Sequence, residues 1–205
     1  MARVSIEYKD HIAHVTLTRG DKMNALDSDM VKAIIAAGQE VAASDARAVV
    51  LSGEGKSFCA GLDLMSFAKM GQVDPEEWLM TRSHHDANEM QEVAMVWRRV
   101  SVPVIAAIQG AAYGGGLQLA LGADIRIAAP NTRVSVMEMK WGIVPDMGGM
   151  ALLPQLLRSD VLRRLTYTAE VVQAEQALTW GLVTELADDP AARAVELATQ
   201  ISNQS

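Results

Sequence analysis

Three consecutive glycines, Gly114-Gly115-Gly116, stand directly before a segment with helical character at 117–121. The first N–H groups of a helix have no partner within the helix, and the helix dipole places partial positive charge there. Glycines leave these donors accessible, so the turn suits an anion or a carbonyl oxygen that gains negative charge during a reaction. Glycines also allow a helix to pack closely on a strand, and the turn alone does not decide between the two interpretations.

A second segment of small residues, Cys59-Ala60-Gly61, follows a short apolar run at 48–51 and a loop. Small residues after a buried strand let backbone N–H groups approach a ligand. The preceding Gly55-Lys56-Ser57 is not the end of a phosphate-binding P-loop, because that motif needs a glycine where Val50 stands.

Two carboxylates are candidates for proton transfer. Glu138 stands among apolar neighbours, which predicts partial desolvation and a raised pKa, although an outward-facing Glu on a strand would give the same pattern. Asp146 lies in a turn between Pro145 and Gly148, where an ordinary turn residue or helix N-cap is the alternative.

Composition limits the class of protein. The chain has 205 residues, 50% of them hydrophobic, which predicts one large α/β domain. A net charge of −7 argues against a general nucleic-acid binder. The single cysteine, Cys59, allows no intrachain disulfide, and the longest apolar stretches, 102–108 and 117–121, are too short to span a bilayer. A cytoplasmic location with no membrane partner and no metal site is expected.

The elements that must position these residues follow from hydrophobic periodicity. Strands are predicted at 4–8, 12–18, 48–51, 102–108 and 124–128, and helices at 30–43, 75–99, 117–121 and 191–201. The order strand, glycine turn, helix, strand recurs, which favours stacked α/β units.

Taken in order, several short motifs resemble the crotonase (enoyl-CoA hydratase/isomerase) superfamily from near the start of the chain to about Glu185. The matching pieces are Lys22-Met23-Asn24-Ala25-Leu26, Phe58-Cys59-Ala60-Gly61-Leu62-Asp63-Leu64, Val102–Ala107, Gly110–Leu117, Ala123–Arg126, Gly142–Pro145, Ala174–Leu178 and Trp180–Val183. Each piece is weak alone, but their order and spacing together identify the family. The resemblance implies an α/β spiral of ββα units, an acyl-CoA thioester substrate, and no cofactor beyond the coenzyme A carried by the substrate.

The resemblance also implies site residues. The two oxyanion donors of the family fall on the backbone N–H groups of Leu62 and Gly115. The positions that line the coenzyme A and substrate site match Lys22, Ala25, Ala60, Leu62, Asp63, Leu64 and Met65. Lys22 could equally be an ordinary loop lysine.

The acid–base positions depart from those of the family's hydratases, which use two glutamates. Glu138 matches the second position, but Gln118 stands at the first, and an amide can orient a ligand or water without acting as a base. Asp146 matches an aspartate of the dienoyl-CoA isomerase branch. The chemistry expected is therefore double-bond isomerisation through Glu138 and Asp146, or hydration of a 2-enoyl-CoA with Glu138 as base and Gln118 holding the water.

Two further interpretations stay open. The absence of one acid would suit a non-catalytic acyl-CoA-binding subunit. Asp146 also matches the nucleophile of the family's aryl-CoA dehalogenases, which would need His84 or His85 as a base and Trp141 nearby.

The resemblance divides the chain into a spiral core, 1–189, and the start of a C-terminal helical oligomerisation region, 190–205. Chains of the family continue beyond the position that matches Ser205, so this region looks incomplete. A homotrimer or hexamer is expected, with no nucleic-acid partner.

Overall fold

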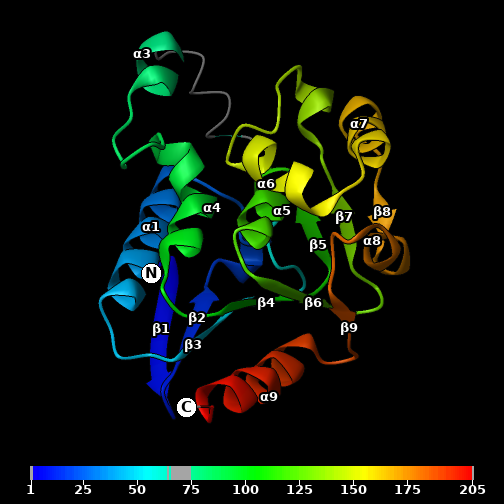
Figure 1. Cartoon of the computed structure of the whole chain (residues 1–205). Coiled ribbons are helices and arrows are strands. Elements are labelled where there is room, and N and C mark those ends of the chain that lie inside the picture. Colours follow the sequence, from blue (N-terminus) through cyan, green and yellow to red (C-terminus); the bar gives the residue numbers. More distant parts are fainter. Residues whose placement is uncertain (1, 64, 66–74, 205) are drawn as a thin grey trace.

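The computed structural model describes residues 2–63, 65 and 75–204. Within them, six strands form a large sheet in the order β1-β2-β3-β4-β6-β9, and three form a small sheet in the order β5-β7-β8 (Figure 1). The strands of the large sheet are β1 Val4–Lys9, β2 Ile12–Leu17, β3 Ala48–Gly53, β4 Val104–Ile108, β6 Ile125–Ala128 and β9 Glu185–Leu186. Those of the small sheet are β5 Ala111–Tyr113, β7 Arg133–Ser135 and β8 Val172–Gln173.

The helices of the described residues connect and cover these strands. They are η1 Gly20–Lys22, α1 Ser28–Ala42, α3 Pro75–Met80, α4 Glu89–Arg99, α5 Gly115–Leu121, η2 Glu138–Trp141, α6 Gly149–Leu156, α7 Ser159–Thr168, α8 Ala174–Trp180 and α9 Pro190–Ser202. A strand of the large sheet, a strand of the small sheet and a helix follow one another in β4, β5 and α5. This order agrees with the expected α/β spiral of ββα units.

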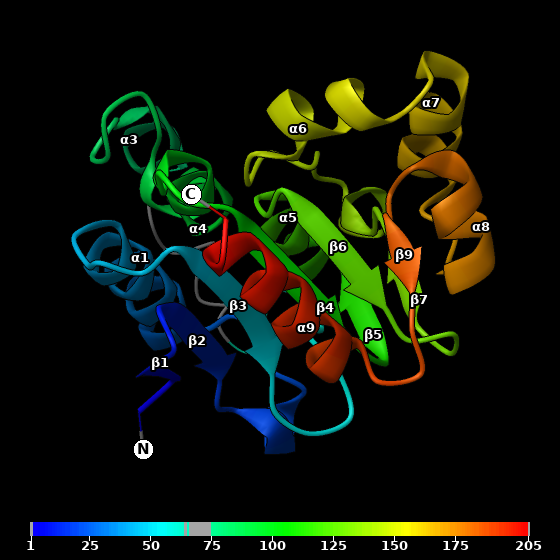
Figure 2. The same cartoon turned by 60° about the horizontal axis from the view of Figure 1, so that its bottom comes forward.

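The central strands β3 and β4 of the large sheet are buried on both faces. From β2 to β9 its neighbouring strands run parallel, and only the β1–β2 hairpin is antiparallel. Val49 and Leu51 of β3 face the main core with α1 and α4, whereas Ala48 and Val50 pack with α9. Figure 2 shows α9 lying across the outer face of the sheet. This double burial explains why β3 and β4 have apolar runs rather than alternating patterns.

The helix predicted from Pro75 to Arg99 is wrong as a single element. Helix α3 ends at Met80, and α4 begins only at Glu89. The Asn88 side chain accepts a hydrogen bond from the Gln91 N–H at 2.8 Å, and the Gln91 side chain accepts from the Asn88 N–H at 3.0 Å. This capping box starts a new helix, because it satisfies N–H groups that an uninterrupted helix would bond internally.

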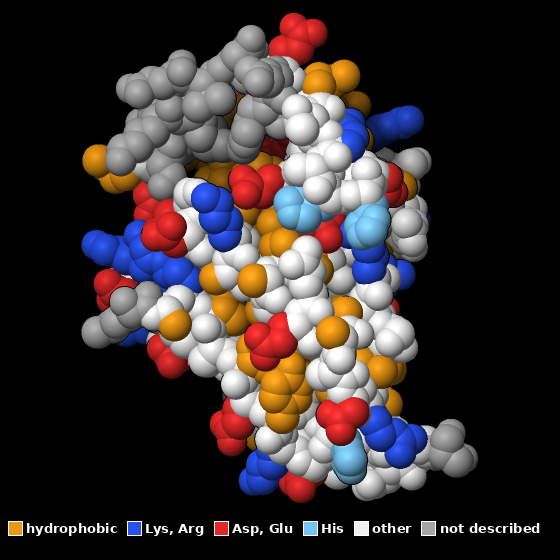
Figure 3. Space-filling view, turned by 90° about the vertical axis from the view of Figure 1, so that its left-hand side faces the viewer, with side chains coloured by type: hydrophobic (Ala, Val, Ile, Leu, Met, Phe, Trp, Pro, Cys, Tyr) orange, Lys and Arg blue, Asp and Glu red, His pale blue; other side chains and the backbone are white. Residues whose placement is uncertain are grey.

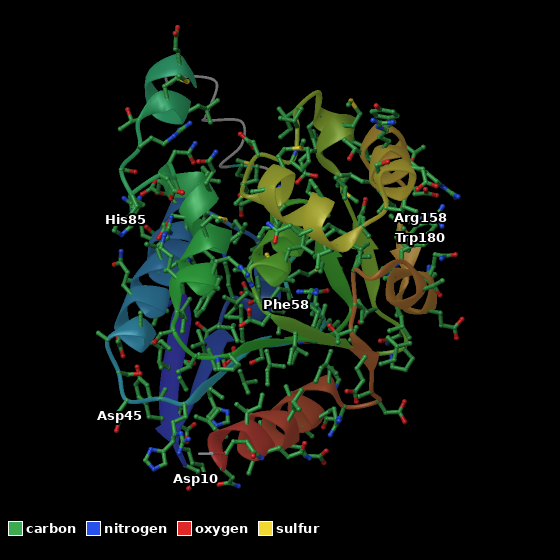
Figure 4. The ribbon with its side chains drawn as sticks, viewed as in Figure 1. Asp10, Asp45, Phe58, His85, Arg158 and Trp180 are labelled. Carbon is green, nitrogen blue, oxygen red and sulfur yellow. The ribbon has the colours of Figure 1, made fainter. Side chains whose placement is uncertain are left out.

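As a result, His84 and His85 lie in the α3–α4 loop and not on a helix. Histidine side chains reach the surface on the face seen in Figure 3, and Figure 4 places His85 at the outer edge of the molecule, far from the buried Phe58. Among the residues that the structure describes, no helix is long and apolar enough to cross a membrane.

Candidate active site

The loop that carries the Lys22–Leu26 motif is held against the segment after β3 by the side chain of Asn24. This side chain is fully buried. Its Nδ2 donates to the carbonyls of Glu54 at 3.0 Å and Ser57 at 2.9 Å, and its Oδ1 accepts from the Arg19 N–H at 2.9 Å. Asn24 has a φ of 52°, a left-handed conformation that asparagine tolerates better than most residues. One amide therefore joins the two loops.

Backbone hydrogen bonds extend this junction to the second motif. The Leu26 N–H donates to the Gly61 carbonyl at 2.8 Å, and the Asp63 N–H donates to the Leu26 carbonyl at 3.0 Å. Between them, the N–H of Leu62 has no hydrogen-bond partner within the described part of the chain. The chain thus fixes this donor on both sides and leaves it unpaired.

The glycine turn lies beside this segment. Strand β5, which leads into this turn, pairs with β7, and the Gly114 N–H donates to the Ser135 carbonyl at 2.9 Å. Gly115 begins α5, so its N–H is one of the unpaired donors of a helix start. A Cβ added at Gly61 would lie 2.5 Å from the Tyr113 carbonyl oxygen and 3.6 Å from the Gly115 nitrogen. The two unpaired donors, on Leu62 and Gly115, therefore lie on neighbouring pieces of backbone.

Glu138, at the start of η2 after β7, brings a carboxylate to the same place. Its side chain is 6% exposed, and a Cβ added at Gly114 would lie 3.2 Å from its Oε1. Gln118 Nε2 donates to Oε1 at 2.7 Å, whereas the buried Oε2 has no partner among the described residues. Burial raises the pKa of Glu138, the nearby charge of Asp146 raises it further, and the hydrogen bond from Gln118 opposes both.

Gln118 lies one turn into α5 and is 2% exposed, and its side-chain amide contacts Glu138. Its Oε1 accepts from the N–H of Gly149, the first residue of α6, at 2.8 Å. Asp146 lies half-buried in the turn before α6, and this burial raises the pKa of its carboxyl. Gln118 and Asp146 both approach Glu138, but neither is among the described residues that line the adjoining cavity.

That cavity has a volume of about 680 Å³. The residues that the sequence predicted for the site and that line it are Lys22, Ala25, Ala60, Leu62, Asp63, Met65, Gly115 and Glu138. The prediction for Leu64 lies outside the described residues. His84 and His85 are not among the described residues that line this cavity, whereas Trp141 is.

The cavity is also lined by Arg19, Tyr113 and Ile143, which were not predicted as site residues from the sequence. Arg19 Nη1 donates to the Ala25 carbonyl at 2.9 Å and pairs with Asp63 Oδ2 at 2.9 Å. Arginine at the start of a polar loop is a common surface pattern, and the contact with Asp63 depends on a fold that joins distant segments. Nothing in the local sequence identifies it.

Comparisons with known proteins identify the family of the chain. The family model of enoyl-CoA hydratase/isomerase matches residues 7–205. The chain is 33% identical to the (E)-benzylidenesuccinyl-CoA hydratase of Thauera aromatica, over 92% of this chain and 71% of that protein. It is also 33% identical to the human mitochondrial Delta(3,5)-Delta(2,4)-dienoyl-CoA isomerase, over 95% of this chain and 62% of that protein.

Among solved structures, the enoyl-CoA hydratase from Thermoplasma volcanium superposes with a TM-score of 0.86 at 30% identity, covering 100% of this chain and 79% of that one. A match of this extent in sequence, together with the shared fold, exceeds what a common architecture alone would give. The chain therefore belongs to the enoyl-CoA hydratase/isomerase family of the crotonase superfamily.

Proposed function

We propose that the chain catalyses proton transfer on an acyl-CoA thioester through an enolate. The backbone N–H groups of Leu62 and Gly115 would hold the thioester oxygen, and Glu138 would exchange the proton. The proposal is supported by two backbone donors without a partner among the described residues and by the buried carboxylate of Glu138, because Leu62, Gly115 and Glu138 all line one cavity. A fixed donor of this kind typically contributes roughly 10²–10³ in rate, because it needs no reorganisation as charge develops.

Migration of a double bond is the reaction that two neighbouring acids suit best. Glu138 would remove a proton from C2 of a 3-enoyl thioester, and the electrons of that C–H bond would move onto the thioester oxygen. Asp146, protonated at the start of the cycle, would then deliver its proton to C4, which leaves the double bond between C2 and C3. Proton exchange with solvent would return Glu138 to the carboxylate and Asp146 to the acid, so the cycle has no net change in atoms. Burial raises the pKa of Asp146, which favours the protonated form that this step requires.

Hydration of a 2-enoyl-CoA is the second candidate. Glu138 Oε2 is a buried acceptor without a partner among the described residues, and such an atom suits a hydrogen bond from a water. That water would add its oxygen to C3 while a proton goes to C2. In this mechanism Asp146 is dispensable, whereas Glu138 is not.

Incubation of the purified protein with 2-enoyl-, 3-enoyl- and dienoyl-CoA thioesters separates the two candidates. Glu138→Gln should abolish either reaction. Asp146→Asn should abolish isomerisation and spare hydration. Hydration that survives Asp146→Asn would remove Asp146 from the mechanism, and an unchanged rate in Glu138→Gln would refute the proposal itself.

The same assays test the remaining interpretations. A non-catalytic acyl-CoA-binding subunit would bind the thioesters and convert none of them, whereas an aryl-CoA dehalogenase would release halide from a halogenated aryl-CoA. We expect turnover without added cofactor after exchange into EDTA, since coenzyme A belongs to the substrate. A homotrimer or hexamer is the expected assembly, which light scattering on the purified chain measures.

A further inference from the structure

The side-chain amide of Gln118 has only one possible orientation. A backbone N–H can only donate, so the partner of the Gly149 N–H must be the amide oxygen, at 2.8 Å. The amide nitrogen then has to face Glu138 Oε1, at 2.7 Å. Both hydrogen bonds are buried, and swapping the oxygen and nitrogen would break both of them.

The contacts of Glu138 are correspondingly unequal. Oε1 accepts from Gln118 and lies against Gly114, whereas Oε2 is buried and has no hydrogen-bond partner among the described residues. Rotation of the carboxylate would exchange the two oxygens only by breaking the bond to Gln118. The amide thus distinguishes two oxygens that would otherwise be equivalent.

We propose that Gln118 is a positioning residue that holds Glu138 through Oε1 and so assigns proton exchange with the substrate to Oε2. The inference rests on the proposed role of Glu138 as the acid–base residue. Gln118 acts as a relay: the N-terminus of α6 polarises its carbonyl through Gly149, and this strengthens the donation of its N–H to Glu138. A glutamine serves here because it accepts on one side and donates on the other.

Gly149 is part of the same device. A Cβ added at this residue would lie 2.6 Å from Gln118 Oε1 and 3.1 Å from Cβ of Pro145. Gly149→Ala therefore displaces the amide of Gln118 without changing its chemistry, and offers an independent way to disturb the relay.

Other ionisable groups near Glu138 stay constant in these variants. Asp146 approaches it from the turn before α6, and Tyr113, Arg19, Asp21, Lys22 and Asp63 share its cavity. A change in the titration of Glu138 is then attributable to the altered hydrogen bond.

The test compares Gln118→Met, which has a similar length but cannot form these hydrogen bonds, with Gln155→Met as a matched control. Gln155 is an exposed glutamine of α6 that bonds only the Ala151 carbonyl among the described residues. Carbon-13 NMR of protein labelled at glutamate carboxyls follows the titration of Glu138, whose signal is the one missing in Glu138→Gln. This readout does not depend on turnover, and the pH profile of kcat/KM is measured in parallel.

In Gln118→Met we expect Glu138 to titrate at higher pH, because burial is no longer opposed by the donated hydrogen bond. The acid limb of the pH profile should move with it, and kcat/KM should fall at least about tenfold, part of the roughly 10²–10⁴ that a placed acid–base group supplies. Gln155→Met should match the wild type. If Gln118→Met does not fold, Gly149→Ala carries the test, with the same direction expected.

Unchanged titration of Glu138 and an unchanged pH profile in a folded variant would overturn the inference. That result differs from failure of the proposed function, in which Glu138→Gln itself would leave turnover intact.

Discussion

Replacement of Asn24 by alanine tests how the fold positions the Leu62 donor. The substitution removes three hydrogen bonds, to Arg19, Glu54 and Ser57, in a position that solvent does not reach. The bond to Ser57 is buried, so water does not reach the carbonyl that it leaves unpaired, whereas the bonds to Arg19 and Glu54 are partly buried. The loop would lose its hold on the segment that ends at Leu62.

The magnitude follows from these contacts. Each hydrogen bond contributes about 1 kcal/mol net, and the buried carbonyl left unpaired raises the loss, so three bonds amount to about 3 kcal/mol or more. Alanine in the left-handed conformation that Asn24 adopts, at a φ of 52°, adds about 1 kcal/mol. The free energy of unfolding should thus fall by roughly 3–5 kcal/mol, a large part of the stability of a typical domain.

Equilibrium unfolding in urea measures this loss, with Asn131→Ala as the control because Asn131 is exposed. The control should change the free energy of unfolding by no more than about 0.5 kcal/mol. Asn24→Asp keeps the acceptor for the Arg19 N–H but sets a buried carboxylate against the carbonyl oxygens of Glu54 and Ser57, so it should not restore the lost stability. A loss below about 1 kcal/mol in Asn24→Ala would refute the assignment of Asn24 as the link between the two loops.

Three other predictions follow from buried groups and close contacts. Burial raises the folded-state pKa of Glu138, so this residue favours folding in its protonated form, and its contribution is lost as the pH rises through that pKa. Glu138→Gln should therefore gain stability relative to the wild type in urea unfolding at about pH 8, and the gain should vanish at about pH 4, below the unfolded-state value. Gly110→Ala should lower the free energy of unfolding by more than about 3 kcal/mol, because the new Cβ would lie 1.9 Å from the Lys56 carbonyl oxygen. Gly142→Ala is the control, since Gly142 has a similar φ but a Cβ there would have nothing within 4 Å. It should lower the free energy of unfolding by only about 1 kcal/mol. Burial raises the pKa of the Cys59 thiol to about 12, so a thiol-specific reagent should label native protein far more slowly than unfolded protein at neutral pH, and rapid labelling of the native state would contradict its burial.

Local sequence patterns predicted the strands that are buried on both faces. The apolar runs at 48–51 and 102–108 correspond to β3 and β4, which are buried on both faces and so leave a continuous hydrophobic signal. The glycine turn at the start of α5 could also be predicted from the sequence, because only glycine fits the close contacts at these positions. A Cβ at Gly116, for example, would lie 2.2 Å from the Cys59 carbonyl oxygen.

The sequence contains a signal for the break between α3 and α4, but the helical pattern on both sides of it predicts one continuous helix. Asn88 and Gln91 have the spacing of a capping box, which outweighs periodicity where a chain must turn. Other features were not accessible locally. The bond from Gly149 to Gln118 joins residues 31 positions apart, and the pairing of Arg19 with Asp63 depends on the junction at Asn24. Contacts of this kind follow from the strand order, which no local pattern specifies.

Proton exchange between Glu138 and an enolate held by two backbone donors can be measured in the absence of a net reaction. A saturated acyl-CoA is incubated with the protein in D₂O, and loss of its C2 proton signal is followed by NMR. We expect exchange with the wild type and a rate lower by at least about a hundredfold with Glu138→Gln, the lower range of what a placed acid–base group contributes. Equal exchange rates for the two proteins, with Glu138→Gln shown to be folded, would contradict this role of Glu138.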